Sequence, residues 1–320
     1  YMHINDGTST QTVGNATTNY GYSGSKAGAT GNLAIAGGMN AKASGQQSLS
    51  LGSYTKSEGD YSVVIGSSHD NSSWMSSRGQ TFALGNYSVA LGRGAQTWKD
   101  NSIAIGHRVE VAGEESIGIG KYVFTGAYSS VPTERGSGIT AVGRKLGVDG
   151  INTNVFGQGD ISDIGGGTPI RANDSTILGN RNGLGALDSN GQEITPSSIS
   201  INDYATGSHI LGNDSQILGN NAIVIGNKSF AYQNSVALGY ATRASGDKSI
   251  AVGYGTEAKG EKSISIGTGN LVLGNKSSAI GDPSFIDTTA IGTHVQGNDN
   301  GTATNPIKAS ESTFMGNTNL

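Results

Sequence analysis

The chain has 320 residues, of which 52 are Gly and only 14% are charged, and its formal net charge at pH 7 is −4. Abundant Gly, Ser, Thr and Asn disfavour helices, because Gly costs about 1 kcal/mol relative to Ala and the short polar side chains compete for backbone hydrogen bonds. The small negative charge excludes a strong field for capturing nucleic acid or anionic lipid. The absence of Cys excludes disulfides, thiol nucleophiles and Cys-based zinc sites.

A short motif repeats along the chain. It consists of an apolar residue, a small residue, a second apolar residue and Gly. The stretch SIAVGYGTEAKGEKSISIG, residues 249 to 267, contains it twice, ending at Gly253 and Gly267. Motif glycines repeatedly lie 14 or 7 residues apart, and such spacing indicates a structural repeat rather than one assembled site. Small and polar residues alternate after each motif, as in Thr256, Glu257 and Ala258, which is the period of a strand with one buried face.

Each unit of 14 residues therefore predicts two short strands, each closed by a Gly turn. Strands of about five residues do not form a stable hairpin alone, but stacked coils satisfy one another's backbone groups. Where the spacing is 7, as in residues 209 to 226, both strands of a coil carry the motif. We expect an all-β, parallel β-roll of about 14 residues per coil, with aliphatic side chains along its axis.

In chain order, residues 1–32 are expected to be an N-terminal cap, residues 33–292 the repeats, and residues 293–320 a looser C-terminal part. Four intervals between motif glycines exceed the repeat. They predict inserted loops at residues 67–80, 121–137, 158–175 and 180–208.

The central residue of the motif is small in almost every copy. If it points outward, it permits close approach of another backbone, so these residues are candidates for an interface between protomers. The alternative is that small residues merely tolerate a tightly curved coil. The candidates are Ser50, Ala83, Ala90, Ala104, Gly118, Ala237, Ala251 and Ser265.

Aromatic residues are scarce, yet several fall in the expected insertions. They are Trp74, Tyr122, Phe124 and Tyr128, and Met75 beside Trp74 is a further candidate for ligand binding. Exposed aromatics in loops on a rigid scaffold are typical of binding hot spots. The alternative is that they fold back and cover the coils beside the insertion.

No constellation of catalytic or metal-binding residues is recognised. The histidines at positions 3, 69, 107, 209 and 294 lack paired-ligand spacing. The oxygen-rich stretches at 188–193 and 297–302 do not fit the EF-hand spacing, and Asn-Gly and Asp-Gly pairs also form turns. We therefore expect no catalytic residue, no cofactor and no metal.

Three stretches resemble the head repeats of YadA-like trimeric autotransporter adhesins: QQSLSLGSYTKSEGDYSVVIG (46–66), NYSVALGRGAQTWKDNSIAIG (86–106) and NSVALGYATRASGDKSIAVGYGTEAKGEKSISIG (234–267). The resemblance implies a left-handed parallel β-roll in a side-by-side homotrimer at the surface of a Gram-negative bacterium. It also implies a neck, a coiled-coil stalk and an outer-membrane anchor, none of which is recognised in this sequence, so we expect an excised head. Known partners in the family are extracellular matrix proteins such as collagen, fibronectin or laminin, host cell-surface receptors, and the protein itself in autoaggregation.

The favoured function is thus a non-enzymatic adhesin head that attaches by many weak contacts. The alternative is a left-handed β-helix enzyme of the acyltransferase type. Its repeats run at 6 and 18 residues, whereas these run at 7 and 14, and His107 is the one candidate for its catalytic residue.

Overall fold

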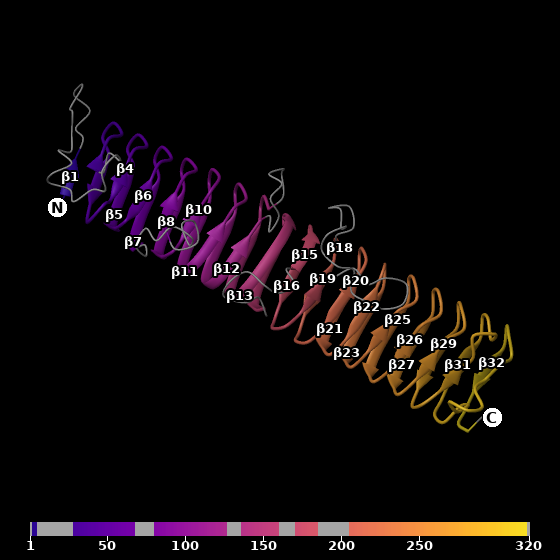
Figure 1. Cartoon of the computed structure of the whole chain (residues 1–320). Helices are drawn as coiled ribbons and strands as arrows, with labels where there is room; N and C mark the ends of the chain where they lie inside the picture. The colour runs from indigo at the N-terminus through magenta and orange to yellow at the C-terminus, as the bar shows by residue number, and fades with distance from the viewer. Residues whose placement is uncertain are drawn as a thin grey trace. The chain divides into compact units, whose positions relative to one another are not determined.

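The computed structural model describes residues 2–4, 28–67, 80–126, 136–159, 170–184 and 205–318. All regular elements in these ranges are β-strands, wound into a parallel solenoid of about 15 turns (Figure 1). The chain divides into two compact units, Tyr1–Pro169 and Ile170–Leu320, which are described in turn. Within the described ranges, no helix has the length and apolar character needed to cross a membrane.

Each coil of unit 1 has two walls. The motif wall is formed by most of the strands that carry the apolar–small–apolar–Gly motif. The second wall is formed by the short strands between them, of which Thr81–Ala83 also enters a copy of the motif, the one that ends at Gly85. The motif wall contains β3 (Ile35–Gly37), β5 (Leu49–Ser53), β7 (Val63–Ser67), β9 (Val89–Arg93), β11 (Ile103–Val111), β12 (Ile117–Thr125), β13 (Thr140–Ile151) and β14 (Asn154–Gln158). The second wall contains β2 (Gly28–Ala29), β4 (Lys42–Ala43), β6 (Thr55–Ser57), β8 (Thr81–Ala83) and β10 (Gln96–Thr97), and it continues in the second halves of β11 to β13. β1 (Met2–Ile4) pairs antiparallel with β3.

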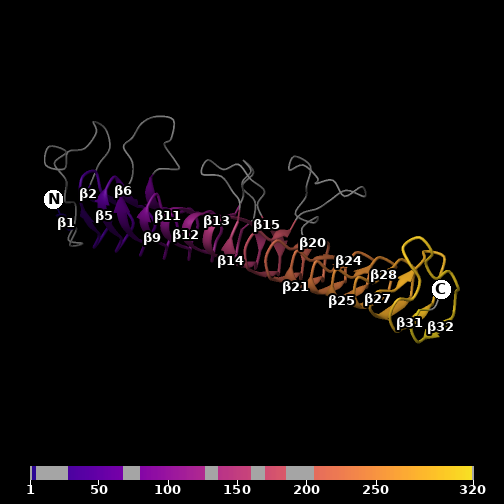
Figure 2. The same ribbon diagram turned by 90° about the horizontal axis from the view of Figure 1, so that it is seen from below.

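Unit 2 repeats this plan. Its motif wall contains β16 (Thr176–Leu178), β19 (His209–Leu211), β21 (Ile223–Asn227), β23 (Val236–Tyr240), β25 (Ile250–Tyr254), β27 (Ile264–Thr268), β29 (Ser278–Gly281), β31 (His294–Gln296) and β32 (Thr313–Met315). Its second wall contains β17 (Gly183–Leu184), β20 (Gln216–Leu218), β22 (Phe230–Tyr232), β24 (Arg243–Ala244), β26 (Glu257–Ala258), β28 (Leu271–Val272) and β30 (Phe285–Ile286). β15 (Ile170–Asn173) pairs in parallel with β18 (Ala205–Thr206). Figure 2 shows strands of this unit from below, with the coils following one another from β21 to β32.

Register is uniform, and identical motif positions therefore form columns. Gly239 pairs with Gly253, Gly253 with Gly267, and Gly267 with Gly281. The spacing of 7 is explained by alternation between walls, because β19, β20 and β21 follow one another along the chain while β19 pairs with β21. The parallel ladder also extends past residue 292, since β29 pairs with β31 and β31 with β32.

The interior of the coils is filled by the small central residues, not by the aliphatic residues that flank them. Ala104 and Ala251 are 0% exposed, while their neighbours Ile103 and Ile250 point outward and are partly or largely exposed. The expectation that the motif's aliphatic side chains line the axis is therefore wrong. The central residue is Ala or Ser in most coils, whereas Ile177 and Ile210 occupy the same inward position in unit 2.

Side-chain sizes on the two walls are complementary. In unit 1 the second wall contributes Val109, Val111 and Val123, all fully buried, and the facing motif residue is Gly118. A Cβ atom on Gly118 would lie 2.8 Å from a methyl carbon of Val109 and of Val111, so larger residues there would overfill the interior.

A buried Ser precedes most motif strands, and its hydroxyl donates a hydrogen bond to a backbone carbonyl oxygen at the corner of the coil. The Ser102 hydroxyl donates to the carbonyl oxygen of Gly113 in the next coil at 2.7 Å, and the Ser235 hydroxyl donates to that of Gly246 at 2.6 Å. Buried carbonyl oxygens without a donor are costly, so these hydroxyls explain why the repeat places Ser at this corner.

Two of the corner glycines are required for different reasons. Gly253 has a φ of +133°, and a Cβ atom there would lie 1.8 Å from the carbonyl oxygen of Gly267 in the next coil. Gly255 has a φ of +59°, but nothing lies within 4 Å of its Cβ position. Gly253 is therefore the position at which the next coil leaves no room for a side chain, whereas Gly255 is required only for its backbone conformation.

Three of the four expected insertions are shorter than predicted. Residues 121–125 belong to β12, residues 170–173 form β15, and residues 183–184 and 205–206 form β17 and β18. β12 runs through the corner into the second wall, where Val123 pairs with Leu146, so the insertion lies beyond Thr125. The parts of these insertions at residues 68–79, 127–135, 160–169 and 185–204 lie outside the described residues.

The two glycines give a matched test of how the coils stack. We expect Gly255→Ala to lower the free energy of unfolding by about 1 kcal/mol, the usual cost of a left-handed backbone for a residue with a Cβ. Gly253→Ala should cost more than about 3 kcal/mol, because the added methyl also collides with the next coil's backbone. Urea unfolding followed by circular dichroism measures both. Equal losses would show that coil spacing does not depend on Gly253.

Candidate functional site

The main exposed feature of both units is an apolar surface on the motif wall, which we call the aliphatic face. Its side chains alternate with the buried central residues and therefore all point outward. Exposed fractions reach 44% at Ile65, 46% at Ile225 and 51% at Leu211. Its members in unit 1 are Ile65, Leu91, Ile103, Ile105, Ile117, Ile119, Val142 and Phe156, and in unit 2 Leu178, Leu211, Ile223, Ile225, Val236, Leu238, Ile250, Val252, Ile264, Ile266 and Ile280.

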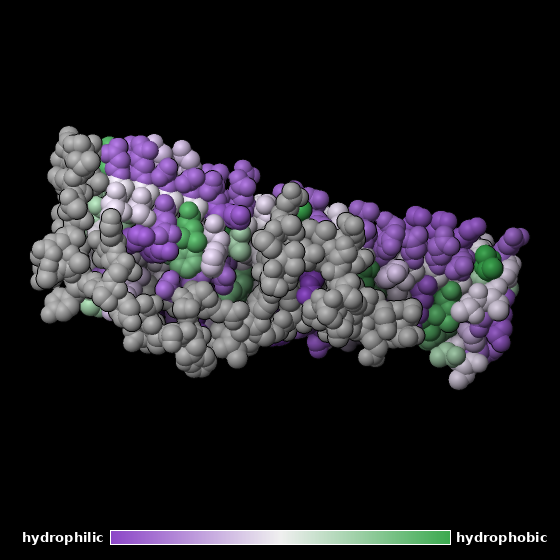
Figure 3. Space-filling model, turned by 45° about the horizontal axis from the view of Figure 1, so that its top comes forward, coloured by the Kyte–Doolittle hydropathy of each residue, from purple (hydrophilic) through white to green (hydrophobic). Residues whose placement is uncertain are grey.

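A surface of this kind contrasts with the rest of the coil. Outward residues of the second wall are charged at Lys42, Lys56, Arg243 and Glu257, although Phe230, Leu271 and Phe285 share the outward column of unit 2. Figure 3 shows a face on which hydrophilic side chains predominate and hydrophobic ones form isolated patches. Contiguous apolar exposure on a soluble protein marks an interaction site.

The predicted interface residues face the wrong way for that role. The structure buries every one of them inside the coil: Ser50, Ala83, Ala90, Ala104, Gly118, Ala237, Ala251 and Ser265. The flanking aliphatic residues are the ones that a partner would contact. The sequence contains a signal for this, because the buried Ser before each motif and the central residue lie two positions apart and so share a face, as Ser249 and Ala251 do.

The predicted ligand-binding aromatics divide into two groups. Trp74, Met75 and Tyr128 lie outside the described residues. Tyr122 and Phe124 belong to β12, are 9% and 8% exposed, and form a small apolar cluster. Cations cover Tyr122, with the Lys121 ammonium 5.2 Å and the Arg108 guanidinium 5.9 Å from its ring centre. The two aromatics are thus packing residues and not exposed contacts.

Exposed tyrosines occur instead at the coil corners. Tyr61 and Tyr87 stack with ring centres 5.0 Å apart and are 41% and 60% exposed. Tyr240 and Tyr254 stack at 5.3 Å with the same exposed fractions. These pairs form because Tyr occupies the same register position in successive coils. The sequence-based prediction considered aromatic residues only in the insertions, so it did not find them.

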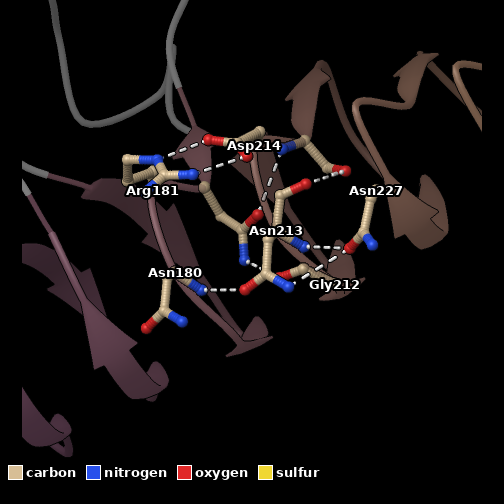
Figure 4. A network of polar contacts seen from close by, with 8 residues as sticks. Asn180, Arg181, Gly212, Asn213, Asp214 and Asn227 are labelled. Atoms are coloured by element: carbon tan, nitrogen blue, oxygen red, sulfur yellow. Dashed lines mark hydrogen bonds and ion pairs between the residues drawn. The ribbon is translucent and has the colours of Figure 1, made fainter.

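Asn and Asp side chains bridge successive coils at the corner where the chain leaves the motif wall. In unit 2 the backbone amide of Asn180 donates to the Asn213 side-chain oxygen at 2.9 Å, and the amide of Asn213 donates to that of Asn227 at 2.9 Å (Figure 4). The Arg181 guanidinium donates two hydrogen bonds to Asp214, at 2.5 and 2.7 Å. This bidentate pair holds the pKa of Asp214 below its ordinary value and raises that of Arg181.

The histidines and acidic residues of the described ranges are spread along the coils. They include no group of three or more His, Asp or Glu side chains that could hold a metal ion. His107 is half-buried, with its ring 5.4 Å from that of Tyr122. Residues 297–302, one of the two oxygen-rich stretches, form a turn around Gly301, which has a φ of +67°, while residues 188–193 lie outside the described ranges.

The ion pair of Arg181 and Asp214 predicts a pH effect with a definite sign. Arg181→Met should raise the pKa of Asp214 toward its ordinary value, because the largest cause of its depression is removed. Since the folded pKa is depressed, the pair's contribution to stability is present above the unfolded pKa and disappears as pH falls through the folded one. Carboxyl NMR titration and unfolding at several pH values measure this. An unchanged titration of Asp214, or an Arg243→Met control with the same shift, would contradict it.

Comparison with known protein families yields one match. The model described as the YadA head domain repeat matches residues 43–68, 83–108, 233–256 and 258–282. No curated protein matches the chain. These matches fall in both units and coincide with the motif strands and the corners between them, so both units contain repeats of the YadA head type.

Proposed function

We propose that this YadA-like head is the binding part of a bacterial surface adhesin, that it assembles side by side as a homotrimer, and that it attaches to host matrix or to other bacteria without catalysis. The observation that carries the proposal is the aliphatic face. A motif wall that exposes Ile, Val and Leu in successive coils presents an apolar surface of the kind that marks an interaction site.

Self-association through this face follows from its composition. Each buried aliphatic side chain contributes about 1.5–3 kcal/mol relative to an exposed one, so even partial burial of several coils would offset the entropy lost on association. The uniform register extends the face over successive coils in each unit. Three such faces meeting on a common axis would cover one another and leave the three second walls in water.

Attachment is proposed to be multivalent. A trimer presents every surface feature three times, and many copies on one cell convert weak contacts into strong attachment. The partners proposed are collagen, fibronectin, laminin or host cell-surface receptors, together with heads on other bacteria. Trp74, Met75 and Tyr128 remain candidate contact residues, whereas the burial of Tyr122 and Phe124 removes those two.

The proposed location is the cell surface of a Gram-negative bacterium, with anchoring in the outer membrane through segments outside the present chain. The family match supports a surface-exposed adhesin. The acyltransferase alternative has no structural support of its own, because its one candidate residue, His107, packs beside Tyr122.

Two neighbouring strands on opposite walls provide a test of self-association. Ile225→Asp, on the aliphatic face, should weaken association at least tenfold, because each copy would bring a carboxylate into an apolar interface. Tyr232→Asp, on β22 of the second wall, should leave the assembly intact although Tyr232 is 43% exposed. Light scattering of each chain gives the molar mass. A monomeric parent chain, or equal effects of the two substitutions, would contradict the proposal.

Binding can be tested with the purified chain on immobilised collagen, fibronectin and laminin and on host cells. We expect binding to at least one surface and stronger retention for the assembled chain than for Ile225→Asp, because avidity requires several linked copies. Bacteria displaying the chain should also clump. Absence of both binding and clumping would rule out the adhesin role.

A further inference from the structure

Two pairs of tyrosines, one in each unit, stack across successive coils at the corners of the solenoid. The rings of Tyr61 and Tyr87 have centres 5.0 Å apart and planes only 1° from parallel. Those of Tyr240 and Tyr254 have centres 5.3 Å apart and planes 11° from parallel. These separations are close to the distance between neighbouring strands, about 4.8 Å, so the rings follow the stacking of the coils. We call the two pairs the tyrosine stacks.

Uniform register holds the two rings of each stack at equivalent places. Tyr240 pairs with Tyr254 at the ends of their strands. In the other stack the backbone amide of Tyr87 donates to the carbonyl oxygen of Asp60 at 2.8 Å, directly beside Tyr61. Two residues further on, the backbones of both coils pair in register. The side chains of a stack therefore leave the backbone in the same direction, and their rings face one another over corresponding atoms.

The repeat does not require tyrosine at either position. Tyr61 and Tyr87 lie directly before a buried Ser, where other coils have Asn or Lys. Tyr240 and Tyr254 directly follow a motif Gly, where other coils have Ser, Arg, His, Lys or Thr. Tyr61 and Tyr87 also have φ values of +57° and +55°, a left-handed conformation that bulky residues rarely adopt. The stacks are thus a property of this chain and not of the coil geometry alone.

Both stacks are open to solvent. Tyr87 and Tyr254 are each 60% exposed, and their partners Tyr61 and Tyr240 are each 41% exposed. The rings of a stack occupy each other's inner faces, so these faces offer no platform on which a sugar or another flat ligand could bind. The geometry instead presents two phenols face to face, within reach of an oxidant in solution.

Two other tyrosines show what the stacks add. Tyr122 is 9% exposed, and its ring lies 5.4 Å from that of His107. Tyr232 is 43% exposed, but its register neighbour in the preceding coil is Leu218. Tyr122 lacks access to solvent and Tyr232 lacks a phenol beside it in the ladder, so neither combines both conditions.

We propose that the tyrosine stacks are modification sites, at which a haem peroxidase with hydrogen peroxide joins the two rings of each stack as dityrosine within one chain. The peroxidase removes one electron and one proton from each phenol. Hydrogen peroxide takes up both electrons and both protons and leaves as two molecules of water. A carbon–carbon bond then forms between the Cε atoms beside the two hydroxyl groups. The hydrogen on each of these carbons moves to the phenol oxygen, which restores both aromatic rings.

Stacking suits this reaction because each reacting Cε becomes tetrahedral while the new bond forms. A tetrahedral carbon bonds out of the plane of its ring, toward the facing ring, so a face-to-face pair needs little movement to couple. Phenols on separate molecules would first have to meet, whereas those of a stack are already held together by the coils.

A bond between neighbouring coils closes the chain between them into a ring. A solenoid can unravel coil by coil, because each coil contacts only its neighbours. Tyr240 and Tyr254 are 14 residues apart, which is one whole coil, and Tyr61 and Tyr87 are 26 residues apart. Closing such loops removes conformational entropy from the unfolded chain, so the cross-linked protein resists unfolding. The effect arises within one chain and does not rest on self-association.

Peroxidase treatment of the dilute purified chain tests the proposal. We expect dityrosine fluorescence, migration as a single chain under denaturing conditions, and two cross-linked peptide pairs in a digest, Tyr61 with Tyr87 and Tyr240 with Tyr254. Tyr87→Phe and Tyr254→Phe keep a ring in the stack but remove one phenol, so each should reduce its own cross-link at least about tenfold. Tyr232→Phe, at an exposed tyrosine outside the stacks, is the matched control and should retain both cross-links. Circular dichroism confirms the fold of each variant.

Urea unfolding then measures the effect of the cross-links. The treated parent should unfold at a higher urea concentration than the untreated parent. The chain with both Tyr87→Phe and Tyr254→Phe meets the same oxidant and should show no such shift. Absence of the two cross-links, full yields in the Phe variants, links only between chains, or unchanged unfolding of the cross-linked parent would overturn the proposal. Ile225→Asp should cross-link like the parent, so a failure of self-association is distinguished from a failure of this inference.

Discussion

The close approach of backbone to backbone at the motif glycines is the constraint from which the rest of the structure follows. At Gly106, Gly143 and Gly253 a Cβ atom would lie 1.7–1.8 Å from a carbonyl oxygen of the next coil. This contact fixes each coil directly over the previous one, and the buried Ser hydroxyls lock the opposite corner. With both corners fixed, neighbouring coils cannot shift by one residue relative to one another. Equivalent residues of successive coils therefore lie one above another in columns.

Columns explain both the packing and the proposed function. A position that faces inward in one coil faces inward in the next, so the interior is filled mainly by Ala, Ser and Val, with Ile177, Ile210 and Ile217 in part of unit 2. A position that is aliphatic and outward repeats as an apolar face along successive coils of each unit. A single exposed Ile would mean little, but aliphatic residues at the same register position in successive coils form a surface that a second copy with the same coil spacing fits. The repeat therefore produces a surface that is complementary to the same surface on a second copy.

Much of the fold could be predicted from the sequence, because the 14-residue spacing and the alternation of small and polar residues in the second wall are period signals. The orientation of the motif wall was predicted wrongly, since an apolar, small, apolar pattern suggests that the larger residues are buried. Ala251 is buried and Ile250 exposed because the central position of the motif faces inward whatever the size of its residue, as the buried Ile177 and Ile210 at that position show. The insertion near Tyr122 was placed too early because an interval between glycines cannot show that β12 continues through the corner. The stacked tyrosine pairs could not be predicted either, because they require knowing which positions lie side by side in successive coils, and only the register supplies this.

The most direct measurement of the central claim is the reactivity of single thiols on β25, in an Ile225→Asp background so that association does not cover the aliphatic face. With Gly253 fixing the strand over its neighbour, Ile250→Cys should react with a small thiol reagent at nearly the rate of the unfolded chain. Ala251→Cys should react at least about a hundredfold more slowly, because it lies inside a coil that must open first. Faster reaction of Ala251→Cys than of Ile250→Cys, or equal rates in the folded chain, would contradict the assignment of Ala251 to the interior and of Ile250 to the surface. The proposed interface would then lose its basis as well.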